Sequence, residues 1–134
     1  MSLEISRRER EGIVILDLAG RLTAGEESVR LRETLRGLAA AGNARVVLNL
    51  RGVDYIDSTG LGTLVIGYTS LKKAGGALAL LNLNRRNIEL LVFTKLTTVF
   101  EIFADEQEAV NSFFPDRAIQ RFDILAFLQE QAQD

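Results

Sequence analysis

The chain has 134 residues, of which 47% are hydrophobic and 25% are charged, a composition typical of a globular domain. Sixteen basic and eighteen acidic residues give a net charge of −2, so we expect no general affinity for nucleic acid or for an anionic membrane. The absence of cysteine and histidine excludes thiolate nucleophiles, disulfides, zinc sites and hydroxyl–imidazole catalytic pairs. We therefore expect a protein that is not an enzyme and that uses no metal or cofactor.

Nothing in the sequence indicates a membrane segment. There is no run of about 18 apolar residues, the length that a transmembrane helix needs. The N-terminal stretch Met1–Ser6 already follows a strand pattern and lacks the basic-then-apolar layout of a signal peptide. A cytoplasmic location is the default expectation.

The N-terminal part of the chain predicts a hairpin and a helix. Alternating apolar residues predict an edge strand that starts at Leu3, and Glu11-Gly12 predicts a tight turn into a second strand, Ile13–Ala19. The segment Thr23–Glu26 has the spacing of a capping box, with Thr23 as the cap of an amphipathic helix. The predicted apolar face of this helix consists of Val29, Leu31, Leu35 and Leu38.

The middle of the chain predicts a buried strand followed by a long helix. Arg45–Leu50 is a nearly continuous apolar run, typical of a central strand that is buried on both faces. The next helix runs from about Ser58 to Lys73, where Gly75-Gly76 end it. Another strand, Ala77–Leu83, follows. The predicted buried face of the helix consists of Leu61, Leu64, Val65, Tyr68 and Leu71.

The remaining elements complete an α/β pattern. Residues 87–97 predict a helix and Val99–Phe103 a short strand, after which the spacing of Asp105 and Glu108 opens a further helix. Strands that alternate with helices predict a mixed, largely parallel β-sheet with covering helices. The opening hairpin supplies its antiparallel edge.

Pro115-Asp116 interrupts this pattern and divides the chain into a domain of residues 1–114 and a helical C-terminal extension of residues 115–134. The extension carries an apolar stripe on what we predict to be an extra helix. Such a stripe fits a helix that packs on its own domain, which is the simpler interpretation, and also fits a homodimer contact or a partner-docking helix. The stripe consists of Ile119, Phe122, Leu125 and Leu128.

The most informative stretch is Asp-Ser-Thr-Gly-Leu-Gly, residues 57–62, where the central strand gives way to the long helix. Asp57, Ser58 and Thr59 are all favourable N-cap residues. A hydroxyl at this position can also carry a phosphate, because unpaired N–H groups and the helix dipole stabilise negative charge there. We therefore predict that Ser58 is phosphorylated, with Thr59 as the alternative acceptor. The simpler alternative is that both residues only cap the helix.

Two glycines within the same motif indicate a docking surface. Gly60 and Gly62 remove side chains near the start of the helix and are predicted to leave backbone N–H groups open to an approaching partner.

With these features placed, the chain resembles the STAS domains of anti-sigma-factor antagonists. The resemblance covers about residues 3–114, and its specific signal is the Asp-Ser-Thr-Gly-Leu-Gly motif between a buried strand and an amphipathic helix. It implies the STAS fold. The matching segments are Leu18–Leu22, Val46–Leu50, Val53–Gly62, Leu90–Leu96 and Val99–Phe103.

The resemblance implies a partner-switching role in sigma-factor-dependent transcription. In this family, the unphosphorylated antagonist binds an anti-sigma factor, which is also an ATP-dependent serine kinase. The bound anti-sigma factor releases its sigma factor. The kinase phosphorylates the serine directly after the Asp, which corresponds to Ser58, and a metal-dependent serine phosphatase removes the phosphate. The implied partner-binding residues are Asp57, Ser58, Thr59, Gly60, Leu61, Gly62 and Thr23.

One segment departs from the family pattern. Many antagonists carry Asp after the second strand, where this chain has Leu22-Thr23-Ala24-Gly25. Two other functions therefore stay open. One is a STAS scaffold or adaptor subunit of a stress-signalling or lipid-transport assembly without a phosphate switch, and the other is a small-ligand or nucleotide site at the helix N-terminus. The basic pairs elsewhere, including Arg85-Arg86, are interpreted as solvated residues.

Overall fold

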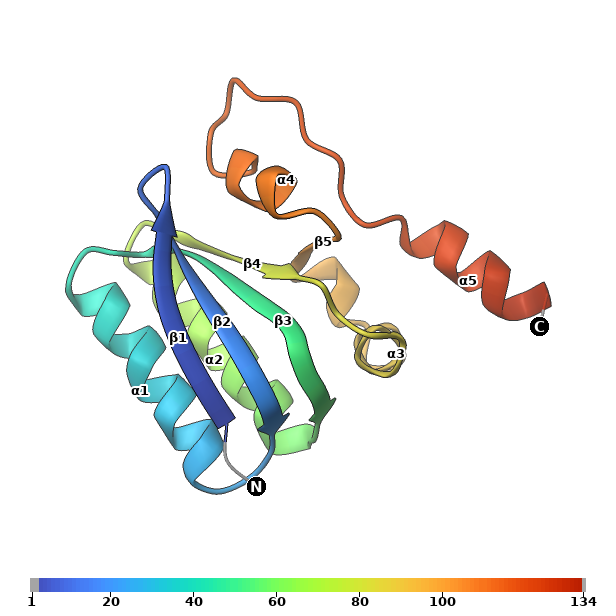
Figure 1. The fold of residues 1–134 in the computed structure, drawn as a ribbon, viewed down its shortest axis with the longest axis horizontal. Coiled ribbons are helices and arrows are strands. Elements are labelled where there is room, and N and C mark those ends of the chain that lie inside the picture. The colour runs from blue at the N-terminus through green and yellow to red at the C-terminus, as the bar shows by residue number, and fades with distance from the viewer. Residues whose placement is uncertain (1–2, 134) are drawn as a thin grey trace.

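The structure is a computed structural model, and the residues that it describes are 3–133. Five strands form one sheet in the order β1-β2-β3-β4-β5. The hairpin of β1 and β2 is antiparallel, and all further neighbours pair in parallel. The predicted mixed, largely parallel sheet is confirmed (Figure 1). The strands are β1 Leu3–Arg10, β2 Ile13–Leu22, β3 Arg45–Ile56, β4 Ala77–Leu81 and β5 Glu101–Phe103.

Helices cover both faces of the sheet. On one face α1 and α2 enclose the larger core with side chains such as Leu35, Leu48 and Leu64, and on the other α4 covers a smaller core around Val47 and Val110. The alternation of Val47 and Leu48 between the two cores confirms that the middle strand is buried on both faces. The helices are α1 Glu26–Ala40, α2 Ser58–Lys73, α3 Arg85–Phe93, α4 Glu106–Asn111 and α5 Ile124–Gln133, with a 3-10 turn at Leu96–Thr98.

The predicted hairpin turn is confirmed at Glu11-Gly12. Both residues have positive φ, 54° and 81°. This is the pattern of a turn whose twist matches that of the flanking strands.

Several predicted boundaries differ from the structure. The strand β3 extends to Ile56 because β2 continues to pair with it, through two register shifts, up to Leu22 opposite Ile56. The helix α3 begins at Arg85, earlier than predicted. The side chain of Asn84 accepts a hydrogen bond from the Asn87 N–H at 2.8 Å and so caps the start of this helix.

The predicted capping role of Thr23 is wrong. The N-cap of α1 is Gly25, whose φ of 112° favours glycine, and no side chain caps this helix. The Thr23 carbonyl instead accepts a hydrogen bond from Ser28 Oγ at 2.7 Å. By contrast, the predicted cap at Asp105 is confirmed, because its carboxylate accepts from the Glu108 N–H at 3.1 Å.

The C-terminal extension packs in part on its own domain, as the simpler interpretation of its apolar stripe expects. Ile119 and Phe122 pack on the domain, but they lie in an extended segment, and the predicted single helical face is therefore wrong. The Phe122 N–H donates to the Ile102 carbonyl at 2.8 Å, so this segment lies along the open edge of β5. The extra helix itself, α5, leaves Leu125 66% exposed and Leu128 39% exposed as it leads away from the sheet (Figure 1). Across residues 3–133, no helix combines the length and apolar character that crossing a membrane demands.

Candidate functional site

Asp57 ties the start of α2 to the end of β2. Its Oδ1 accepts a hydrogen bond from the Gly60 N–H at 2.8 Å, and its Oδ2 accepts one from the Ala24 N–H at 2.9 Å. Its own N–H donates to the Leu22 carbonyl at 3.2 Å. One carboxylate therefore caps the helix and also fixes the loop that contains Thr23, so the two segments form a single surface.

These hydrogen bonds keep Asp57 ionised. Burial raises the pKa of the carboxyl, but hydrogen bonds from the backbone N–H groups of Gly60, Ala24 and Thr59, together with the charge of Arg21, outweigh it and hold the pKa below its ordinary value. The side chain that precedes the hydroxyls is therefore a fixed negative charge.

Ser58 and Thr59 are the first two residues of α2, and both are exposed. Within residues 3–133 the Ser58 side chain makes no hydrogen bond, so its hydroxyl is not the cap that the simpler alternative requires. The cap is Asp57. The backbone of Thr59 accepts from the Thr63 hydroxyl at 3.2 Å, while its own side chain stays at the surface. Two hydroxyls are thus presented to solvent where the helix dipole favours negative charge.

The glycines of the motif have different roles. A Cβ on Gly60 would lie 2.2 Å from the Leu22 carbonyl oxygen, so this glycine permits close packing of α2 against β2. The prediction that Gly60 leaves its N–H open is wrong, because that N–H donates to Asp57. A Cβ on Gly62, which is half-buried, would meet nothing within 4 Å, so open space adjoins this position.

Leu61 does not belong to the surface. Its side chain is buried in the larger core, which corrects the prediction that it contacts a partner. Position 61 instead anchors the first turn of α2, so that the residues on either side keep their orientation.

A groove of about 350 Å³ adjoins Ser58, between the end of β3 and α3. Asn87, buried at the base of α3, holds this helix in place by donating from Nδ2 to the Val53 carbonyl at 3.1 Å. On the rim, Phe93 is 86% exposed. The residues that line the groove are Tyr55, Ile56, Asp57, Ser58, Arg86, Asn87, Glu89, Leu90 and Phe93.

The groove has a basic and aromatic wall that the sequence did not predict. The guanidinium carbon of Arg86 lies 4.6 Å from the centre of the Tyr55 ring, and that of Arg21 lies 5.1 Å from it. These side chains come from α3, β3 and β2, so no sequence spacing connects them. Arg86 is exposed, as expected of a solvated residue, and its guanidinium also lies over an aromatic ring beside the motif.

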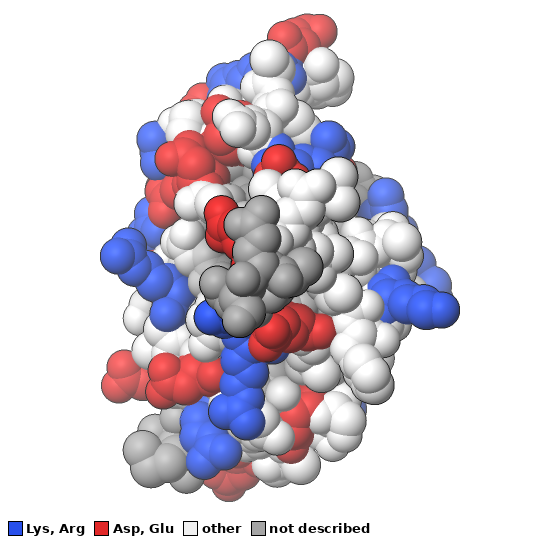
Figure 2. All heavy atoms as spheres, turned by 90° about the vertical axis from the view of Figure 1, so that its right-hand side faces the viewer, with Lys and Arg blue, Asp and Glu red and all other residues white. Residues whose placement is uncertain are grey.

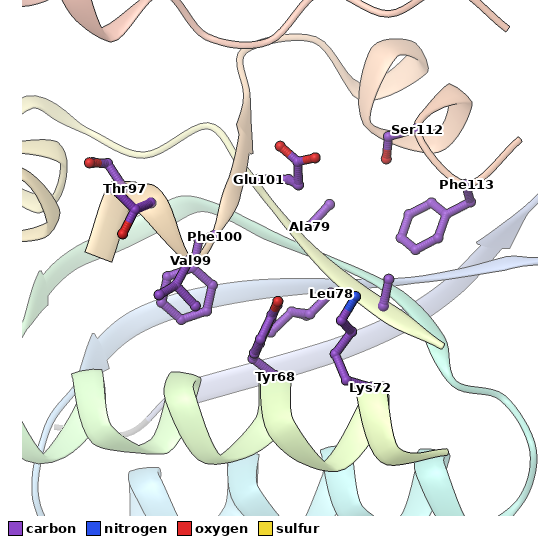
Figure 3. Close-up of a pocket in the computed structure, with 12 residues that line it drawn as sticks. Tyr68, Lys72, Leu78, Ala79, Thr97, Val99, Phe100, Glu101, Ser112 and Phe113 are labelled. Carbon is purple, nitrogen blue, oxygen red and sulfur yellow. The ribbon is translucent and has the colours of Figure 1, made fainter. Parts of the chain in front are cut away.

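A second cavity, of about 320 Å³, lies at the other end of α2. Tyr68 and Lys72 reach into it from the helix, with Glu101 and Phe113 on the opposite side (Figure 3). At about 1.5 Å per helical residue, Lys72 is roughly 20 Å from Ser58, so this cavity is separate from the motif. No cluster that could hold a metal ion occurs among residues 3–133.

Comparison with known proteins shows the family of the chain. The STAS domain family matches residues 4–109. The anti-sigma-B factor antagonist of Bacillus subtilis (strain 168) is 36% identical over 111 residues, which are 83% of this chain and 100% of that protein. The family match spans most of the described fold, and the chain therefore belongs to the STAS domain family.

Solved structures share the fold at lower identity. A Thermotoga maritima protein assigned as an anti-sigma factor antagonist aligns with a TM-score of 0.76 and 24% identity, covering 81% of this chain and 93% of that one. The phosphorylated form of the Bacillus cell fate determinant SpoIIAA aligns with a TM-score of 0.64 and 20% identity, covering 81% and 98%. These likenesses bear on the fold alone.

Proposed function

We propose that this protein is an anti-sigma factor antagonist that is switched by phosphorylation of Ser58. Unmodified, it binds a kinase-type anti-sigma factor, which releases its sigma factor. The observation that carries the proposal is the exposed Ser58 hydroxyl at the first position of α2, next to the fixed carboxylate of Asp57. The switch would act in the cytoplasm, where sigma factors direct transcription.

The proposed chemistry is a phosphoryl transfer and its reversal by hydrolysis. The kinase transfers the γ-phosphoryl group of ATP to Ser58 Oγ, and ADP and the hydroxyl proton leave. A serine phosphatase then adds water across the phosphoester bond, which restores the hydroxyl and releases inorganic phosphate. Neither step requires a catalytic group of this chain, consistent with a substrate and binding module rather than an enzyme.

The phosphate is expected to act at the interface and not on the fold. It adds about −1.5 to −2 charges and three acceptor oxygens. At a helix N-terminus this charge is tolerated, because the dipole and the N–H groups stabilise it. Against a packed partner, beside the ionised Asp57, it adds repulsion and desolvation. A loss of about 3 kcal/mol would weaken binding roughly a hundredfold.

Relatives support this proposal. The Bacillus subtilis relative is named as an antagonist of an anti-sigma factor, and the SpoIIAA fold is known in unphosphorylated and phosphorylated forms. In this chain the partner surface would consist of Asp57, Ser58, Thr59 and Gly62, with Thr23 on the loop that Asp57 holds. Gly60 and Leu61 would support that surface from beneath.

Phosphosite mapping tests the acceptor. The protein is incubated with the cognate anti-sigma factor kinase and ATP, and its tryptic peptides are analysed by mass spectrometry. We expect one phosphate on Ser58, retained in Thr59→Ala and absent in Ser58→Ala. Phosphate on Thr59 would show that Thr59, not Ser58, is the acceptor. A protein that binds its partner stably but accepts no phosphate would instead have the scaffold function.

We also propose that α5 provides a homodimer contact. Leu125 and Leu128 are exposed on α5, whereas Ile124 in the first turn of this helix packs against the larger core. Analytical ultracentrifugation should show a dimer for the full chain and a monomer for Leu125→Ser/Leu128→Ser. A full chain that sediments as a monomer at high micromolar concentration would exclude this contact.

A further inference from the structure

We propose that Arg21 and Arg86 form an oxyanion site beside Ser58, which binds a carboxylate of the partner in the unmodified protein and the phosphate in cis after phosphorylation. The inference rests on the proposed function, and it adds a partner chemistry and a competition between two anions. It predicts that phosphorylation not only adds a charge to the interface but also occupies the cations on which binding depends.

The two guanidinium groups converge on one ring. Arg86 and Arg21 both stack on Tyr55, at 4.6 and 5.1 Å from its centre, although they come from α3 and β2. Tyr55 and Arg86 line the same groove as Ser58. A phosphate on the Ser58 hydroxyl would therefore enter a space that one of these cations already borders.

Neither cation makes an ion pair with a described acid, although the charge of Arg21 helps to lower the pKa of Asp57. Within residues 3–133, no carboxylate lies within ion-pair distance of Arg21 or Arg86, whereas Arg8 has two such carboxylates and Arg117 and Arg121 have one each. A stacked guanidinium keeps its N–H donors free at the ring edge, and these donors match the geometry of a carboxylate or a phosphate. The two arginines are thus held in place but remain able to bind an anion.

The neighbouring charges do not fill this site. Asp57 lines the groove, but its two oxygens accept from Gly60 and Ala24. Glu89 also lines the groove and, among the described residues, makes no ion pair with Arg86, although it lies one helical turn away. Asp54 is exposed near the end of β3 and makes no ion pair with Arg21 or Arg86 among the described residues. An incoming anion therefore has no ion-paired acid to displace, although at Arg21 it would share the field of that cation with Asp57.

The rim of the groove indicates the kind of segment that docks there. Phe93 is 86% exposed, more than any other large apolar side chain on the described surface. The face on which α3 and α5 lie carries an uncharged area bordered by basic and acidic groups (Figure 2). An acidic residue beside an apolar one, on a segment of the anti-sigma factor, would satisfy Arg86 and Phe93 together.

The cis contact is tested without any partner. Phosphoserine is incorporated at position 58 during translation, and its second pKa is followed by ³¹P NMR. An adjacent guanidinium favours the dianion, so we expect this pKa to be about half a pH unit or more higher in Arg21→Gln/Arg86→Gln than in the otherwise native protein. Arg36→Gln, an exposed change on α1, is the control. Equal pKa values in all three proteins would overturn the proposal.

The partner contact is tested on the unmodified protein with the purified anti-sigma factor. Arg86→Glu should lower the affinity by about tenfold or more, and Phe93→Ser should lower it as well, while Arg36→Glu leaves it unchanged. Thermal unfolding of each variant shows that the fold is retained. If Arg86→Glu binds as tightly as the native protein while Ser58→Asp does not, this inference fails and the proposed function stands. If Ser58→Asp also binds normally, the proposed function fails.

Discussion

The starts of α2 and α4 share one local design and differ in charge. Each helix follows an aspartate whose carboxylate accepts from the N–H three residues later, Gly60 at 2.8 Å for Asp57 and Glu108 at 3.1 Å for Asp105. The next residue is Ser58 in α2 and Glu106 in α4. The first is a neutral hydroxyl, whereas the second is a permanent acid.

At the start of α4, the carboxylate of Glu106 is paired with two arginines. Arg8 and Arg10 of β1 both bind Glu106, the latter at 2.8 Å. The hydrogen bond from Arg8, opposed by burial and reinforced by Arg10, lowers the pKa of Glu106 to about 2. A helix start with an aspartate cap therefore accommodates a second negative charge when two arginines are near. The start of α2 has the cap and the two arginines but lacks the charge, which phosphorylation of Ser58 would supply.

The largest expected effect comes from the packing beneath the switch. Gly60→Ala places a methyl group 2.2 Å from the Leu22 carbonyl oxygen, so the start of α2 must move away from β2. We expect a loss of about 3 kcal/mol in the free energy of unfolding, measured by urea denaturation.

Gly62→Ala is the matched control, because nothing lies within 4 Å of the added methyl group. Alanine is the better helix former, so this variant should be more stable than the native protein by about 0.5–1 kcal/mol. Similar losses in the two variants would show that close packing is not the reason for glycine at position 60.

A smaller difference separates the two aspartate caps. Asp57→Ala removes the cap of α2 and also the hydrogen bond to the loop at Ala24, so we expect it to cost about 2 kcal/mol. Asp105→Ala removes only the cap of α4 and should cost about 1 kcal/mol. The measurement is again the urea midpoint of each variant. Equal costs would mean that the bridge from Asp57 to the loop adds no stability.

The smallest effect concerns the charged start of α4. Because the pKa of Glu106 is depressed in the folded state, its contribution is fully present above the ordinary value of 4.5 and is lost as the pH falls toward about 2. Glu106→Gln should therefore be less stable by about 1 kcal/mol at pH 7, a modest figure because the pairs are partly exposed. The difference should shrink when denaturation is repeated at pH 4 and pH 3. A difference that does not depend on pH would argue against a role for these ion pairs.

Local sequence signals predicted much of the fold. The bounds of α2 follow from Asp57 and the glycine pair after Ala74, and the hairpin turn follows from Glu11-Gly12. The cap at Thr23 was predicted wrongly because a threonine three residues before a glutamate fits the pattern, while the backbone conformation of Gly25 decides the cap. The extended part of the tail escaped prediction because Phe122 is held by a backbone hydrogen bond to β5, a contact between distant segments.

At the site, too, features set by neighbouring residues were predicted, and contacts between distant segments were not. The exposed hydroxyls at the start of α2 were predicted, because capping depends on consecutive residues. The buried position of Leu61 could have been anticipated from the apolar face of its helix, to which it was assigned. The stacking of Arg21 and Arg86 on Tyr55 could not, since three elements meet there only after the sheet and α3 are assembled.

The most direct test of the central claim is the affinity of the purified anti-sigma factor for two forms of this protein, measured by isothermal titration calorimetry. One form has the free Ser58 hydroxyl, and the other carries phosphoserine at that position. We expect the phosphorylated form to bind roughly a hundredfold more weakly, with unchanged thermal stability. Equal affinities for the two forms would contradict a switch at the start of α2.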